Sequence, residues 1–225
     1  MTRVHDFHER NAYSLGAALL PFWAEVYERA FPGMRALVVN DRSNAAQHGG
    51  IDHVITLASA KVIRIDTKNR ERSDTGDVLL EYISNDRAET PGWMDQDLLI
   101  DYMAYAFVPD RRAYLFDWEM LRRTWLAFRD DWIAKGERRE DGFSTVRALN
   151  ENRGGQRHMT WSVAVPTPRL LKAVSNARII DLDVPDGATA SLRPTAQYMS
   201  RTAPSRIGDR ADASNRQLGL FGTGR

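Results

Sequence analysis

The neighbouring stretches Ile51-Asp-His-Val-Ile-Thr-Leu57 and Lys61-Val-Ile-Arg-Ile-Asp-Thr-Lys68 decide the fold. Both alternate between apolar and polar residues, which is the two-residue period of a half-buried strand. Only Ala-Ser-Ala separates them, so we expect a β-hairpin. His53 falls on the apolar face, where we expect a partly buried side chain with a hydrogen-bond partner rather than a catalytic base. The other members of this face would be Ile51, Ile55, Leu57, Ile63 and Ile65.

A tight turn that sets Leu57 opposite Lys61 fixes the register of this hairpin. Opposite residues of an antiparallel pair have residue numbers with a constant sum, and Asp52 and Asp66 share the sum of Leu57 and Lys61. We therefore expect the two carboxylates to face each other, with Cβ atoms about 4.5–5.5 Å apart. Lys68, two residues beyond Asp66, points to the same face. A slip of one residue would break this arrangement.

Two carboxylates in direct opposition repel each other unless a cation neutralises them. Hard oxygen ligands favour Mg²⁺ or Mn²⁺, so we expect Asp52 and Asp66 to bind such an ion, with Glu81 on the next predicted strand as a third ligand. Lys68 beside the ion would orient or deprotonate a water, or stabilise charge that develops on a phosphate. The alternative interpretation is a salt-bridge cluster on a solvated face of the sheet. Lysine is scarce here, with only four among the 31 basic residues.

The remaining pattern predicts an α/β domain over residues 1–183, with a mixed central sheet flanked by helices. The helix over 117–135 should bury Leu121, Trp125, Phe128 and Trp132 on its inner face. Further helices are expected over 14–31, where Pro21 either kinks the helix or marks its first turn, and over 166–175. Further strands are expected over 34–40, 78–84, 101–108, 112–116, 143–149 and 160–165.

The order of these elements resembles the PD-(D/E)XK nuclease superfamily, which has the restriction-endonuclease-like fold. The resemblance is carried by a helix, a short strand, Gly50-Ile51-Asp52, the hairpin and Asp66-Thr67-Lys68. The stretch Gly50–Trp93, with Thr90-Pro91-Gly92-Trp93, is similar to phage and prophage members of unknown role. Ile51 replaces the frequent proline of the family, and Asp66 the more frequent glutamate.

This resemblance implies a magnesium-dependent phosphodiesterase that acts on DNA. Asp52 and Asp66 would be the metal ligands and Lys68 the group that positions water. Many members also use an acidic residue of the first helix, for which either Glu25 or Glu28 qualifies here. Many are dimers, so a homodimer is among the expected states.

Residues 184–225 form a second region of different composition. They are rich in Pro, Ser, Thr and Ala and poor in large apolar residues, so we expect a flexible tail. It contains one apolar island at 217–221, which resembles the peptide that binds the bacterial sliding clamp of replication and repair. The resemblance implies that the clamp would be contacted by Gln217, Leu218, Leu220 and Phe221. Such a tethered plug would recruit the domain to DNA.

Composition narrows the classes of function. The 225 residues carry a formal net charge of +1, with 43% hydrophobic residues and no cysteine. A disulfide framework, a thiolate nucleophile and a cysteine zinc site are excluded. No apolar run is long enough for a membrane helix and the first residues lack a signal-peptide pattern, so we expect a cytoplasmic protein without a membrane partner. Besides the nuclease, two alternatives stay open: a non-catalytic DNA- or clamp-binding accessory protein with a nuclease-like fold, and a virion or structural protein.

Overall fold

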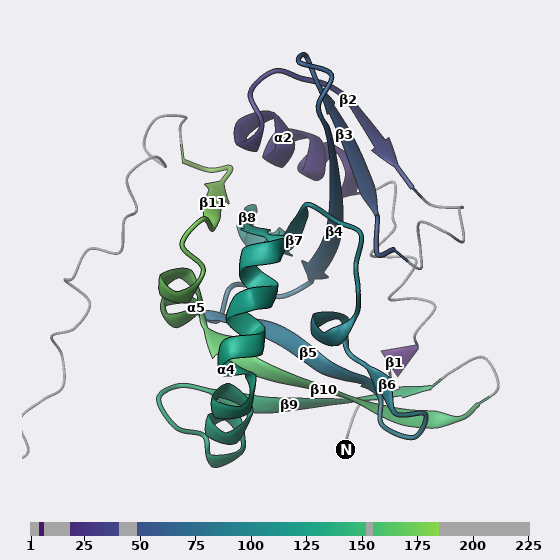
Figure 1. Ribbon diagram of the computed structural model, residues 1–225, viewed down its shortest axis with the longest axis vertical. Coiled ribbons are helices and arrows are strands. Elements are labelled where there is room, and N and C mark those ends of the chain that lie inside the picture. The colour runs from purple at the N-terminus through teal and green to yellow at the C-terminus, as the bar shows by residue number, and fades with distance from the viewer. Residues whose placement is uncertain (1–4, 7–18, 41–48, 152–154, 185–225) are drawn as a thin grey trace, which may run out of the picture. The chain divides into compact units, whose positions relative to one another are not determined.

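The computed structural model describes residues 5–6, 19–40, 49–151 and 155–184. These residues belong to one compact unit, Met1–Pro194. The unit is α/β, as expected, and holds a mixed sheet. The prediction of a single central sheet is wrong, because the strands form two sheets (Figure 1). The predicted tail over 184–225, with its peptide at 217–221, lies outside the described residues apart from Val184.

The first sheet contains the predicted hairpin and has the strand order β11-β8-β7-β4-β3-β2. All neighbours are antiparallel except β4 and β7, which run parallel. The strands are β2 (Met34–Val39), β3 (His53–Leu57), β4 (Val62–Arg70), β7 (Tyr102–Phe107), β8 (Arg112–Asp117) and β11 (Arg178–Asp181).

The second sheet has the order β1-β9-β10-β5-β6, in which β1 is parallel to β9 and the other neighbours are antiparallel. Strand β5, which follows the hairpin in the sequence, belongs to this second sheet and not to the sheet of the hairpin. The strands are β1 (His5–Asp6), β5 (Asp77–Asn85), β6 (Thr90–Pro91), β9 (Ser144–Glu151) and β10 (Arg157–Pro166).

Helices α4 and α5 begin within one residue of their predicted starts, whereas α2 begins at Leu20 rather than at the predicted residue 14. In α2 (Leu20–Ala30) Pro21 lies in the first turn, where its missing N–H costs no hydrogen bond. In α4 (Trp118–Arg138) the side chain of Asp117 caps the start by accepting from the backbone N–H of Met120 at 3.1 Å. The other helices are α5 (Thr167–Ala173) and the 3₁₀ turns η2 (Trp93–Asp95) and η3 (Val108–Asp110). None of the helices in the described ranges combines the length and apolar character needed to cross a membrane.

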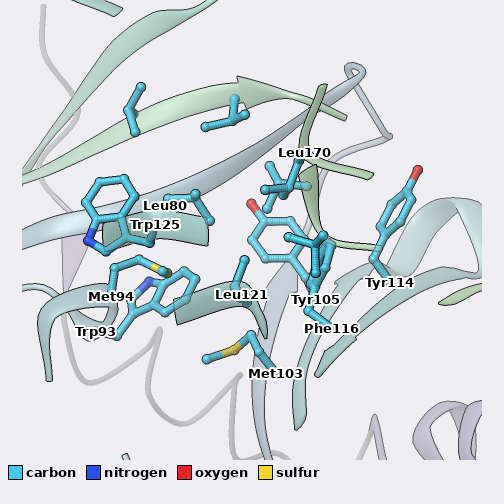
Figure 2. Packing of buried hydrophobic residues seen from close by; sticks show 14 of the residues in the cluster. Leu80, Trp93, Met94, Met103, Tyr105, Tyr114, Phe116, Leu121, Trp125 and Leu170 are labelled. Carbon is cyan, nitrogen blue, oxygen red and sulfur yellow. The ribbon is translucent and has the colours of Figure 1, made fainter. Parts of the chain in front are cut away.

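Strand β7, in the middle of the six-stranded sheet, is buried on both faces, which explains its continuous apolar run. Met103 and Tyr105 of β7 point into a large core with α4 and the five-stranded sheet, and Figure 2 shows Met103 near Trp93 of η2. Ala104 and Ala106 point the other way, into a core with α2 and β11. Strand β4 therefore presents one face to each core.

Two side chains depart from the predicted pattern. Phe128 of α4 is 46% exposed and stacks on the outside of Trp132, although its spacing places it near the apolar stripe. Ile51 packs against the large core instead of sharing the face of Ile55, because β3 begins only at His53.

Candidate functional site

The predicted hairpin register is confirmed. In the antiparallel pair of β3 and β4, His53 lies opposite Ile65 and Val54 opposite Arg64. The regular ladder ends at His53, because the N–H of Asp52 donates to the carbonyl of Ile65 at 3.0 Å rather than continuing the pattern. The side chain of Asp52 still lies close enough to that of Asp66 to raise the pKa of Asp66. The open end of the hairpin therefore brings together the two carboxylates, as the sequence predicts.

The Asp52 carboxylate is held by Thr67, a contact that the sequence reasoning missed. At the end of the ladder, the Oδ2 atom of Asp52 accepts from both the backbone N–H and the hydroxyl of Thr67, each at 2.8 Å. Both bonds go to Oδ2, so the second oxygen, Oδ1, is left outside them. Threonine is common in strands because of its β propensity, so its presence at this position did not indicate that it binds Asp52.

Lys68 and Asp66 form a close ion pair. The Nζ atom of Lys68 donates to Oδ1 of Asp66 at 2.8 Å and to Oδ2 at 2.9 Å. The Asp66 side chain is only 4% exposed, whereas that of Lys68 is 31% exposed. The alternative of a solvated salt-bridge cluster is therefore wrong for Asp66. Asp66 is thus the buried member of the pair, and Lys68 is the member that reaches solvent.

Burial makes the charge state of Asp66 sensitive to its neighbours. Loss of solvent raises the pKa of Asp66 to about 7, and the nearby Asp52 carboxylate adds to the increase while Lys68 opposes it. Burial lowers the pKa of Lys68, but Asp66 and Asp52 more than compensate, so that this pKa is raised overall and the amine stays protonated. Another cation beside the two carboxylates would oppose this increase in the pKa of Asp66, because a nearby positive charge favours the ionised carboxylate.

The turn around η2 completes the surroundings of Lys68. The Nζ atom of Lys68 lies 5.7 Å from the centroid of the Trp93 ring, within cation–π range. The backbone N–H of Trp93 hydrogen-bonds to Glu81, and burial raises the pKa of that carboxyl. Gly92 permits this turn, because a Cβ atom there would lie 2.3 Å from the carbonyl oxygen of Glu81. Trp93 is itself 8% exposed.

A buried pair supports the hairpin from its opposite face. His53 is 5% exposed, and its Nδ1 atom lies 2.7 Å from the hydroxyl of Tyr27 in α2. Burial lowers the pKa of His53 to about 4, although the charge of Asp52 acts in the other direction. The expectation of a buried, hydrogen-bonded histidine is confirmed.

At this site, Asp52 and Asp66 are the two carboxylates that could bind a cation, and no third protein ligand joins them among the described residues. Within the described ranges, no group of three or more Asp, Glu, His or Cys residues is arranged to hold a metal ion, so Glu81 does not join Asp52 and Asp66 in such a group. Glu25 of α2 pairs with Arg111 at 2.6 Å instead, and Glu28 is exposed. A cation would take its protein ligands from Asp52 and Asp66, with the remaining positions open to water or substrate oxygens.

The four clamp-contacting residues expected at 217–221 lie outside the described residues. Comparison with known proteins adds no relative, since no family model, curated protein or solved structure matches the chain. Interpretation of the site therefore depends on its own geometry.

Proposed function

We propose that the protein is a metal-dependent nuclease that hydrolyses phosphodiester bonds of DNA. The observation that carries this proposal is the proximity of the Asp52 and Asp66 side chains at the end of a hairpin, with Lys68 bound to the second carboxylate. Two acidic side chains and one amine converge at β4, beside its buried residues Ile63 and Ile65. A merely structural ion pair would need only one carboxylate.

The side chains divide the work by their positions. Asp52 is fixed by Thr67 and would present Oδ1, while the buried Asp66 would present an oxygen after Lys68 shifts from its two-oxygen contact. Mg²⁺ or Mn²⁺ held by these two residues would supply Lewis-acid stabilisation of charge on the phosphate. Lys68, partly exposed, would orient the attacking water and stabilise negative charge on the phosphoryl oxygens. Water adds to phosphorus and releases a proton to solvent, the bond from phosphorus to the leaving sugar oxygen breaks, and that oxygen takes up a proton from solvent.

A second candidate is a DNA-binding accessory protein that keeps the site without catalysis. The specific observation in its favour is that Lys68 occupies both oxygens of Asp66 and Thr67 binds Asp52, so that the carboxylates have partners without any metal. In that case the ion pair is purely structural.

The test is cleavage of a panel of labelled DNAs with Mg²⁺ or Mn²⁺. The panel contains duplex, nicked, flap, junction and single-stranded DNA. We expect metal-dependent cleavage by the wild type and its loss in Asp66→Asn and Lys68→Met. Lys61→Met is the matched control, because Lys61 is exposed at the turn of the same hairpin. Its activity should equal that of the wild type.

Folded wild-type protein that cuts none of these DNAs with either metal would contradict the nuclease proposal. DNA binding retained in that protein would select the accessory role. Equal loss of cleavage in Lys61→Met and Lys68→Met would also count against the proposal, because it would trace the effect to net charge rather than to the site.

Recruitment by a sliding clamp is part of the same proposal. It is supported by the resemblance of Gln217-Leu218-Gly219-Leu220-Phe221 to a clamp-binding peptide. We expect the full chain to bind a bacterial sliding clamp and the double substitution Leu218→Ala/Phe221→Ala to abolish binding. Unchanged binding in the double variant would refute the role of this peptide.

A further inference from the structure

One face of β4 carries a row of charged residues around the candidate site. Successive side chains of a strand alternate between faces, so Arg64, Asp66, Lys68 and Arg70 share one. The pairing of β4 with β7 keeps a regular register through this stretch, from Asp66 opposite Met103 to Arg70 opposite Phe107. No bulge therefore turns Arg70 away from the face that carries Lys68.

The two arginines at the ends of this row differ in their partners. Arg64 is taken by Asp101, whose carboxylate accepts from its Nε at 3.1 Å and its Nη2 at 3.2 Å. Arg70 has no carboxylate within ion-pair distance in the part of the chain that the structure describes. Arg70 is only partly buried, so the residue keeps some contact with solvent. The unpaired cation lies on the Lys68 side of the row.

The surroundings of Arg70 place its charge near the site. Its positive charge is close enough to lower the pKa of the Tyr105 hydroxyl. Tyr105 is the cross-strand neighbour of Lys68 on β7. Asp77 acts on the same hydroxyl but is engaged by Arg72 at 3.6 Å and by the Thr75 hydroxyl at 2.8 Å. Among the described residues, Arg70 is thus a cation beside Lys68 without a carboxylate in ion-pair contact.

We propose that Arg70 binds the phosphate that neighbours the scissile phosphate, so that the substrate strand runs from Lys68 toward the carboxyl end of β4. Two residues of a strand span about 6.6 Å, a separation close to that of successive phosphates along a nucleic acid strand. An arginine fork suits a phosphate diester, which offers acceptors only. The statement that the neighbouring phosphate is the scissile one rests on the proposed function. The contact between Arg70 and a phosphate does not depend on it. Arg64 lies on the other side of Asp66 and is already bound to Asp101, so it offers no equivalent phosphate contact toward the amino end of β4.

The experiment measures DNA binding without catalysis. Fluorescence anisotropy of a labelled 12-nucleotide single strand in EDTA, over a range of NaCl concentrations, gives Kd and its salt dependence. We expect Arg70→Gln to weaken binding about five- to tenfold and to reduce the slope of log Kd against log salt by about 0.7, the value for one phosphate contact of a single strand. Arg64→Gln, which removes the same charge from the same face, should leave both quantities unchanged. Arg70→Lys should keep most of the slope.

The outcomes separate this inference from the proposed function. An unchanged slope in Arg70→Gln, or an equal decrease in Arg64→Gln, overturns the phosphate contact whether or not the wild type cuts DNA. A reduced slope only in Arg70→Gln supports it, even if the wild type proves catalytically inert. Melting curves of the three variants verify that each is folded at the assay temperature.

Discussion

Thr67 donates its backbone N–H and its hydroxyl to one oxygen of Asp52, at 2.8 Å each. The backbone N–H would otherwise continue the β-ladder, but β3 ends its pairing at His53, and the carboxylate takes the place of the missing carbonyl. The middle residue of Asp66-Thr67-Lys68 is therefore as much a part of the site as its neighbours. It orients the carboxylate that faces Asp66.

Replacement of Thr67 by valine tests this positioning role. Thr67→Val keeps the shape and the backbone bond but removes the hydroxyl, which costs about 1.5–3 kcal/mol for a hydrogen bond to a charged group. If the site binds Mg²⁺, the loosened Asp52 should weaken Mg²⁺ affinity several-fold in isothermal titration. Thr67→Ser restores the donor and should behave like the wild type. Equal Mg²⁺ affinity in the valine and serine variants would show that the hydroxyl does not position Asp52.

The raised pKa of Asp66 predicts a pH dependence of stability with a definite sign. Its pKa is about 7 in the folded protein and about 3.9 in the unfolded chain. Between these values the folded state holds a proton that the unfolded state has released, so the free energy of unfolding falls as pH rises. Asp66→Asn has no carboxyl group to ionise, so its free energy of unfolding should increase relative to that of the wild type from pH 4 to pH 7. Urea unfolding across this range measures the difference, and a constant difference would contradict the assignment.

His53 should produce the opposite trend. Its pKa is about 4 in the folded protein and about 6.5 in the unfolded chain, so the folded state binds fewer protons. Its contribution to stability grows as pH rises from 4 to 6.5 and is lost on acidification. His53→Gln should therefore fall further behind the wild type over this interval, on top of a pH-independent cost of about 1–3 kcal/mol for disturbing the bond to Tyr27. A gap that narrows with pH in the same unfolding series would refute this.

Gly92 should tolerate no side chain. A Cβ atom would approach the Glu81 carbonyl oxygen to 2.3 Å, so Gly92→Ala must displace η2 or β5. We expect a loss of at least about 3 kcal/mol, the upper range for overpacking. Gly76→Ala is the comparison, because its Cβ would meet nothing within 4 Å and only its positive φ of 81° is strained. That substitution should cost about 1–2 kcal/mol. Similar losses in thermal or urea unfolding would mean that the turn can relax.

The local geometry of the hairpin was predictable because its turn is short and its strands largely alternate between apolar and polar residues. These two features fix the register, and with it the proximity of Asp52 to Asp66 and the position of Lys68 beside Asp66. The burial of His53 follows from the same alternation. Short-range periodicity and turn length were sufficient for the side chains of this site that lie on one hairpin.

The partition of strands between two sheets was not predictable in the same way. The apolar run of β5 has the same pattern in either sheet, so nothing local indicates that it pairs with β10 rather than with the hairpin. Strand β11 has only four residues, and its place is set by pairing with β8. The contact of Trp93 with Lys68 depends on this long-range arrangement, because η2 follows β5 and not β4.

The pairing of β1 with β9 has a consequence for the order of folding. His5 lies beside Asn150, and α2 reaches β11 through the bond from Arg29 to the carbonyl of Asp181, so both sheets need partners from distant parts of the chain. Loop-closure entropy makes such contacts slow to form. The hairpin of β3 and β4 has no such delay, since its strands are adjacent in sequence. During synthesis Asp66 would emerge solvated and ionised, and its transfer into the interior would wait until the later strands leave the ribosome.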